Sequence, residues 1–189
     1  MLMQVGAYGW EHDQWQGSFY ENKLPEDWHL TFYAKRFNTV LAPYEFWTQC
    51  SVEQVEEFCS DVDKDYPLLF EVNENETDEK VIQLLASVDS SLKNTICFNE
   101  SAWSKETSGY HLRQAQIVQS QNLVQGNAAV FLLTSDLLLK DVFLREIMQS
   151  LKTDFSQYDV IYLYFGGELV NVDVIRTGCT LLKMLSLNH

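Results

Sequence analysis

Three glutamates follow or end successive apolar segments of the sequence, and one histidine lies in its first loop. The glutamates are Glu45, Glu71 and Glu100, and the histidine is His12, which stands between two carboxylates. Carboxylates that converge can bind a divalent cation or divide acid and base roles between them. A neighbouring carboxylate can also raise the pKa of a histidine, which favours proton transfer near neutral pH. These four residues are the catalytic candidates, and the alternative is that they are solvated side chains in a chain with 27 acids.

Aromatic side chains form a second group of candidates, and these would bind a ligand without transforming it. Residues 6–20 alone contain two tryptophans, two tyrosines, one phenylalanine and three glycines. Such rings can line a pocket, or they can cover the top of a small hydrophobic core. The candidate binding residues are Tyr8, Trp10, Trp15, Phe46, Trp47, Asn73 and Trp103. Their residue types leave both roles open.

Common catalytic and metal-binding motifs are missing from the sequence. It contains no glycine-rich phosphate loop, no G-x-S-x-G turn and no H-E-x-x-H helix. The four cysteines form no C-x-x-C pair and have no histidine at zinc-ligand spacing, so buried reduced thiols are expected. The acidic run from Asp61 to Asp65 lacks the glycine and the closing glutamate of a calcium loop. No cofactor is therefore predicted, and a divalent metal at the glutamates is the one alternative.

The elements that must position these residues include a series of short apolar runs. Runs of four to six residues rich in branched and aromatic side chains predict strands that are buried on both faces. They lie at residues 3–8, 39–42, 68–72, 95–98, 129–133 and 160–165, with a weaker candidate at 122–125. In parallel α/β folds, ligands bind at the carboxyl ends of the strands. By that rule, the candidate residues are those that follow or end the predicted strands.

Helical periodicity separates these runs. A helix is predicted to begin at Ser51, where Gln54 completes a capping box, and to continue toward Tyr66. A second helix is predicted after a cap at Thr77, a third over residues 136–151 and a fourth over 174–185. Alternating strands and helices predict a parallel α/β fold. Because a complete eightfold barrel needs roughly 200 to 250 residues, the 189 residues predict a single domain, 1–189, with a reduced or incomplete TIM-like (β/α) barrel.

The negative charge of the chain restricts its partners. The formal net charge is −14, and eleven acids stand against two lysines between Glu53 and Lys80. Such a field repels polyanions, so no nucleic-acid partner is predicted. No apolar run is long enough to span a membrane and no secretion signal opens the chain, so we expect a cytoplasmic protein without a membrane partner. A small molecule and a second copy of the chain are the partners left open.

The opening of the chain, "GAYGWEHDQWQGSFYENKLPEDWHLTFYAKRFNTV", resembles the start of the YecE-like family, domain of unknown function 72. Members of this family begin G-x-x-G-W, W-x-G-x-F-Y, L-P and Y-A-x-x-F-N-T-V, and this chain matches these motifs in register. Residues 158–185 are similar to the strand, turn and helix that close the family. The resemblance implies a β/α barrel with a cleft at the strand ends and no established reaction.

Departures from the family pattern suggest what the cleft has lost. Asn73 stands where the resemblance implies a lysine, and Glu100 stands where it implies a basic or histidine position. Leu132 to Ser135 replace an expected arginine and histidine. Lysine and arginine stabilise bound phosphate or carboxylate groups, so an anion-processing site is predicted to be impaired or absent.

Two hypotheses of function follow from these observations. The first is a non-catalytic small-molecule-binding or scaffold protein with an aromatic-lined cleft that has lost its cations. The second is a metal-assisted hydrolase or isomerase of a polar small molecule, which uses the glutamates and His12. The missing cations favour the first.

Overall fold

The computed structural model describes residues 1–73, 77–87, 94–97, 104–107, 110–120, 127–135, 140–167 and 169–186. The strands are β1 (Leu2–Tyr8), β2 (Val40–Ala42), β3 (Leu68–Glu71), β4 (Asn94–Cys97), β5 (Ser104–Thr107), β6 (Tyr110–Ser120), β7 (Ala128–Ser135) and β8 (Val160–Gly167). The helices are α1 (His29–Ala34), α2 (Tyr44–Trp47), α3 (Val52–Ser60), α4 (Glu79–Ser87), α5 (Asp141–Asp154) and α6 (Val172–Ser186). Short 3-10 turns cover Asp13–Trp15 and Glu26–Trp28.

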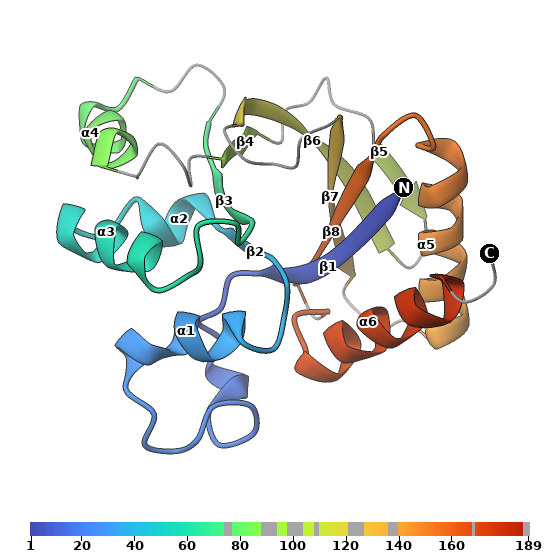
Figure 1. Cartoon of the computed structure of the whole chain (residues 1–189), viewed down its shortest axis with the longest axis horizontal. Coiled ribbons are helices and arrows are strands. Elements are labelled where there is room, and N and C mark those ends of the chain that lie inside the picture. The colour runs from blue at the N-terminus through green and yellow to red at the C-terminus, as the bar shows by residue number, and fades with distance from the viewer. Residues whose placement is uncertain are drawn as a thin grey trace.

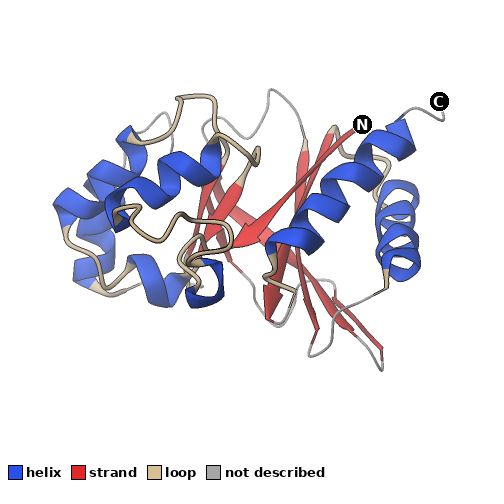
Figure 2. Cartoon of the chain, turned by 90° about the horizontal axis from the view of Figure 1, so that it is seen from below, coloured by secondary structure: helices blue, strands red, loops and turns tan. Residues whose placement is uncertain are grey.

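These elements form an α/β fold around one curled, mostly parallel sheet. The strand order is β4-β3-β2-β1-β8-β7-β6-β5, and every neighbouring pair from β4 to β7 is parallel. β4 also pairs with β6, so the sheet curls and brings its two ends together. Figure 1 shows α1 to α4 on one side of the strands and α5 and α6 on the other, and Figure 2 shows the same division from below.

The prediction that all strands are parallel is wrong for one part of the sheet. β6 runs antiparallel to β4, β5 and β7. Two residues separate β5 from β6, and seven separate β6 from β7. A parallel crossover needs about a dozen residues or more, so these short connections require antiparallel strands. Neither β5 nor β6 was predicted from the sequence.

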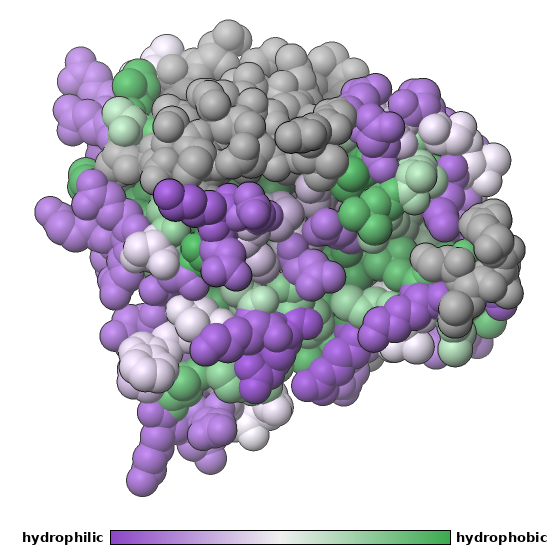
Figure 3. All heavy atoms as spheres, in the orientation of Figure 1, coloured by the Kyte–Doolittle hydropathy of each residue, from purple (hydrophilic) through white to green (hydrophobic). Residues whose placement is uncertain are grey.

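The two faces of the sheet pack into different clusters. Alternate side chains point to opposite faces of a strand. One face, here called the inner face, carries a small cluster that includes Leu41, Leu69, Leu132, Tyr162 and Tyr164. The other face packs in the main core with the helices; a Cβ at Gly178 of α6, for example, would lie 3.2 Å from the ring of Phe165. Figure 3 shows the surface of one face of the molecule. Its described residues are mainly hydrophilic, with hydrophobic residues between them.

A buried polar network joins β1 to its neighbours near the middle of the fold. The hydroxyl of Tyr33 accepts a bond from the Ala7 amide at 2.8 Å and donates to the carbonyl of Thr39 at 3.2 Å. The hydroxyl of Thr39 bonds the Pro67 carbonyl at 2.8 Å and lies 2.5 Å from the Tyr164 hydroxyl. Only glycine fits at position 6 beside Thr39, because a Cβ there would lie 2.2 Å from the Thr39 carbonyl oxygen. The network therefore fixes how β1, α1, β2 and β8 meet.

The observed starts of α3 and α4 can be compared with the caps predicted from the sequence. The capping box of Ser51 and Gln54 is confirmed at the start of α3. That helix ends at Ser60, so the acidic run that follows lies in a loop. At α4 the predicted cap is wrong by one residue, because the carboxylate of Asp78, not Thr77, accepts the amide of Lys80 at 2.9 Å.

The third predicted helix also begins later than expected, at Asp141. Its first apolar residues, Val142 and Phe143, are 64% and 50% exposed, whereas Ile147 and Leu151 are buried as predicted. The weak strand candidate at 122–125 lies outside the described residues. In the described part of the chain, no helix is long and apolar enough to cross a membrane.

Candidate functional site

The side chains of Tyr8 and Glu71 meet where β1 and β3 end. The hydroxyl of Tyr8 donates a 2.5 Å hydrogen bond to Oε2 of Glu71. β2 lies between their strands, and its Leu41 pairs with Tyr8 on one side and with Leu69 on the other. The bond therefore reaches across a strand, next to the inner cluster, at the edge where parallel α/β folds bind ligands. We call this pair and its surroundings the Tyr8–Glu71 site.

Helix α2 holds Glu71 from a second direction. The backbone amide of Tyr44 donates to Oε2 of Glu71 at 3.1 Å. The indole Nε1 of Trp47 donates to the backbone carbonyl of Glu71 at 2.8 Å. α2 begins directly after β2, behind Pro43, so its first turn lies beside the end of β3. Two donors on one oxygen fix the position of the carboxylate.

The protonation of Tyr8 follows from its surroundings. Burial raises the pKa of the Tyr8 hydroxyl well above its ordinary value, and the bond to Glu71 and the negative charges of Glu71 and Glu45 raise it further. The positive charge of Arg113 lowers it, but by less than the other effects raise it. Tyr8 therefore stays protonated at neutral pH, and it acts as a hydrogen-bond donor.

Arg113 reaches this site from β6. It pairs with Leu132, which pairs with Tyr164, and paired residues point to the same face of a sheet. Arg113 therefore lies on the inner face, within electrostatic reach of Tyr8. The expectation of a cleft without positive charge is wrong in this respect. Arg113 was not among the candidate residues because β6, the strand that carries it, was not predicted from the sequence.

The predicted glutamates are only partly brought together. Glu45 is exposed on α2, close enough to Tyr8 for its charge to raise the pKa of that hydroxyl. Asn73 is exposed two residues beyond Glu71. Glu100 and Trp103 lie outside the described residues. Among the residues that the structure describes, no group of three histidine, cysteine or acidic side chains is placed to hold a metal ion.

His12 lies in the loop that leaves β1, and its environment differs from the prediction. Its ring packs edge-on against Trp15, with centroids 4.5 Å apart. Its Nε2 is buried without a hydrogen-bond partner among the residues that the structure describes, and a Cβ at Gly9 would lie 3.3 Å from that atom. Burial lowers the pKa of His12, whereas nearby backbone carbonyls and Asp13 raise it by less. The predicted rise in pKa is therefore wrong, and His12 is neutral at pH 7.

The aromatic candidates pack mainly in the core. Trp10, Trp15 and Trp47 are each at most 1% exposed. Trp10 packs edge-on against Phe46 and Phe58, at centroid distances of 5.0 and 5.1 Å, and Trp15 stacks on Tyr33. Phe46 is half-buried. Rings that are this buried offer almost no surface to a ligand, so the proposals below rest on the half-exposed groups around Tyr8.

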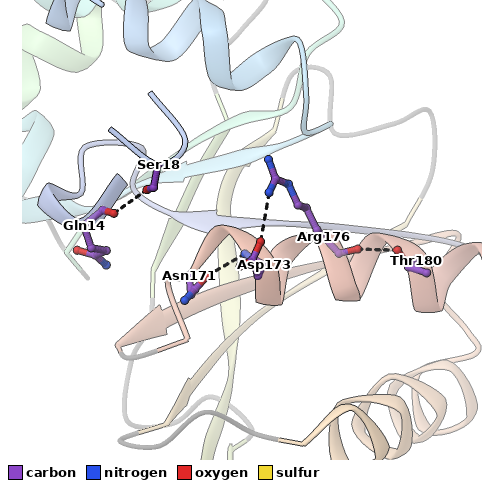
Figure 4. A network of polar contacts seen from close by, with 6 residues as sticks. All are labelled: Gln14, Ser18, Asn171, Asp173, Arg176 and Thr180. Carbon is purple, nitrogen blue, oxygen red and sulfur yellow. Dashed lines mark hydrogen bonds and ion pairs between the residues drawn. The ribbon is translucent and has the colours of Figure 1, made fainter. Parts of the chain in front are cut away.

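The loop after β1 is fixed to the start of α6. The indole Nε1 of Trp15 and the side-chain amide of Gln14 donate to the carbonyl of Val170, at 3.1 and 3.2 Å. Figure 4 shows polar contacts on both sides of this junction: Ser18 bonds the Gln14 carbonyl within the loop, and Asn171, Asp173, Arg176 and Thr180 are bonded along the start of α6. This junction orients the loop that carries His12.

Comparisons with known proteins agree with the fold. The family model described as "Protein of unknown function DUF72" matches residues 4–116. A solved structure, that of a DUF72 family protein from Thermotoga maritima, is similar with a TM-score of 0.55 and 10% sequence identity, over 98% of this chain and 100% of that one. At this identity the likeness concerns the fold alone. No curated protein matches the sequence significantly.

Proposed function

Because the chain belongs to the DUF72 family of proteins of unknown function, we propose a role for it from its own site: it binds a small polar molecule at the carboxyl ends of β1, β2 and β3. The observation that carries this proposal is the hydrogen bond between Tyr8 and Glu71, which α2 holds in place. Both side chains stay partly exposed although their positions are fixed. Ligand sites typically combine a few fixed polar groups with apolar surroundings.

We favour binding without catalysis. The described groups supply a fixed carboxylate and a phenol that keeps its proton at neutral pH, which suits recognition better than proton transfer. The alternative, a metal-assisted hydrolase or isomerase, needs carboxylates that converge on a metal. Glu45 is exposed and Glu100 lies outside the described residues, so no specific observation favours that alternative.

The scaffold that we propose for this site is a reduced TIM-like barrel. Six of the strands are parallel neighbours, and the pairing of β4 with β6 draws the sheet into a curl. The similarity to the Thermotoga maritima structure supports this proposal. The net charge of −14 supports a small molecule over a nucleic acid as the ligand.

Screening of polar small molecules by thermal shift would test the proposed function. Compounds that raise the melting temperature should be titrated by calorimetry into the wild type, Glu71→Gln and the control Glu53→Gln. Glu53 is exposed on α3. We expect Glu71→Gln to weaken binding and Glu53→Gln to leave it unchanged. Equal affinity in all three proteins would place the binding elsewhere and contradict the proposal.

A further inference from the structure

One oxygen of Glu71 is left open at the Tyr8–Glu71 site. The hydroxyl of Tyr8 and the amide of Tyr44 both donate to Oε2. Oε1 accepts no hydrogen bond from the residues that the structure describes, and it is not one of their buried polar atoms without a partner. Oε1 is therefore accessible to solvent, and a ligand that approaches this carboxylate meets an acceptor whose direction is already set.

The charges around this oxygen favour a positive ligand. Glu71 and Glu45 carry two formal negative charges, Tyr8 is neutral, and Arg113 carries one positive charge, so the net charge of the four is −1. The strongly acidic chain adds a field that attracts cations toward its surface. A neutral hydroxyl could also donate to Oε1, but an ammonium group adds the Coulomb attraction between opposite charges, which a hydroxyl lacks.

We infer that the ligand of the Tyr8–Glu71 site is a small organic cation, whose protonated amine donates a hydrogen bond to Oε1 of Glu71. This inference rests on the proposed function, and it adds the chemical class of the ligand. Because Tyr8 and Tyr44 already hold the carboxylate, an ammonium group would find its partner oriented before binding. Such preorganisation lowers the entropic cost of the complex.

Arg113 sets a limit on the charge of this ligand. It lies on the inner face within reach of Tyr8, so it repels a cation that binds beside Tyr8. A ligand with two or more positive charges would meet this repulsion more strongly than a ligand with one. The inference is therefore a ligand with a single ammonium group.

Three probes of similar size test the inference. Propylamine, 1-propanol and propionate carry a cationic, a neutral and an anionic head on a short alkyl chain. Each would be titrated at pH 7 and low salt into ¹⁵N-labelled protein, while the backbone amide resonances of Tyr8, Tyr44 and Glu71 are followed. We expect propylamine to shift these resonances at lower concentration than the other two probes.

Two substitutions with opposite expected effects make the test specific. Glu71→Gln keeps the size and an acceptor but removes the charge, so it should weaken propylamine binding by about tenfold or more. Arg113→Gln removes the repelling charge, so it should strengthen binding by about two- to threefold at low salt. Glu53→Gln on α3 is the matched control and should change nothing. The unfolding midpoint and the amide spectrum of each variant show whether it is folded, and Arg113→Gln tests the charge dependence separately from Glu71.

Two outcomes would overturn this inference alone, and a third would contradict the proposed function as well. Stronger binding of 1-propanol or propionate at the same resonances would overturn the cation and leave a small-molecule site in place. Propylamine binding that Glu71→Gln does not weaken would overturn the inference, because the amine would then bind elsewhere. If none of the three probes moves these resonances, both the inference and the proposed site are contradicted.

Discussion

Tyr8 and Glu71 stand 63 positions apart in the sequence, and the hydroxyl of one lies 2.5 Å from the carboxylate of the other. They meet because β1, β2 and β3 are parallel neighbours whose carboxyl ends share one edge of the sheet. The amide of Tyr44, at the start of α2, joins them on the same oxygen. A substitution that breaks this bond is therefore expected both to destabilise this edge of the sheet and to change the position of Glu71 in the proposed site.

Tyr8→Phe should lower the free energy of unfolding by about 1 kcal/mol. The substitution removes the donor to Glu71 while keeping the ring, and partial exposure reduces the value of a bond to a charged group. Urea denaturation followed by circular dichroism measures the change. Tyr158→Phe is the control, because the ring of the half-buried Tyr158 packs against Phe155 while its hydroxyl has no hydrogen-bond partner among the described residues. Equal effects of the two variants would mean that the Tyr8 bond adds nothing to stability.

Trp15→Ala should destabilise the protein by about 3 to 5 kcal/mol, the range for removing a large buried ring. Trp15 is 1% exposed, stacks on Tyr33 and donates to the Val170 carbonyl. Trp28→Ala is the matched control, because Trp28 is 61% exposed, and it should cost far less. Chemical denaturation compares the two. A Trp15→Ala protein as stable as the wild type would remove this indole from the core and favour its role as a ligand contact.

Gly6→Ala should cost about 3 kcal/mol or more. The new Cβ would lie 2.2 Å from the carbonyl oxygen of Thr39, which is backbone and cannot rotate away, so β1 and β2 would have to separate. Gly178→Ala is the comparison: its Cβ would lie 3.2 Å from the ring of Phe165, and alanine favours the helical backbone of α6. We expect a much smaller change there. Thermal denaturation measures the stability of both variants. Similar losses of stability would show that the contact between Gly6 and Thr39 is not specially tight.

The free energy of unfolding should fall as the pH rises above about 10. Burial raises the pKa of Tyr20, Tyr33 and Tyr164 well above the ordinary value of 10.0. The unfolded chain therefore releases these protons near pH 10 while the folded protein keeps them. Because the folded state then binds more protons, each further rise in pH favours unfolding, and below pH 10 these residues add no pH dependence.

An alkaline titration followed by tyrosinate absorbance and circular dichroism measures this effect. The buried tyrosines should ionise together with the loss of secondary structure. Tyr33→Phe should reduce the slope of stability against pH above pH 10. The prediction fails if all nine tyrosines ionise near pH 10 while the dichroism stays native.

Much of the parallel core was predictable from the sequence. Runs such as residues 68–72 and 160–165 are apolar on both faces, and a strand buried on both faces requires this. The capping box of Ser51 and Gln54 was predictable as well, since both of its bonds lie within four residues. The opening motifs identified the family, and the match over residues 4–116 confirms it.

The hairpin of β5 and β6 was not predictable in the same way. Its strands carry many polar residues, for example Gln114 and Gln116 beside Arg113, so the apolar signal that revealed the other strands is weak there. Because β6 was not predicted, Arg113 could not be placed on the inner face from the sequence alone. The positive charge near Tyr8 was therefore missed.

The sequence by itself determined the apolar strands of the parallel core and the start of α3, because burial and capping leave patterns within a few neighbouring positions. Only the tertiary structure decided which side chains face one another: that Tyr8 bonds Glu71, that Arg113 lies on their face, and that Trp10 and Trp15 pack in the core. The physical reason is that strand order and register set these distances, and both depend on pairings between segments far apart in the chain.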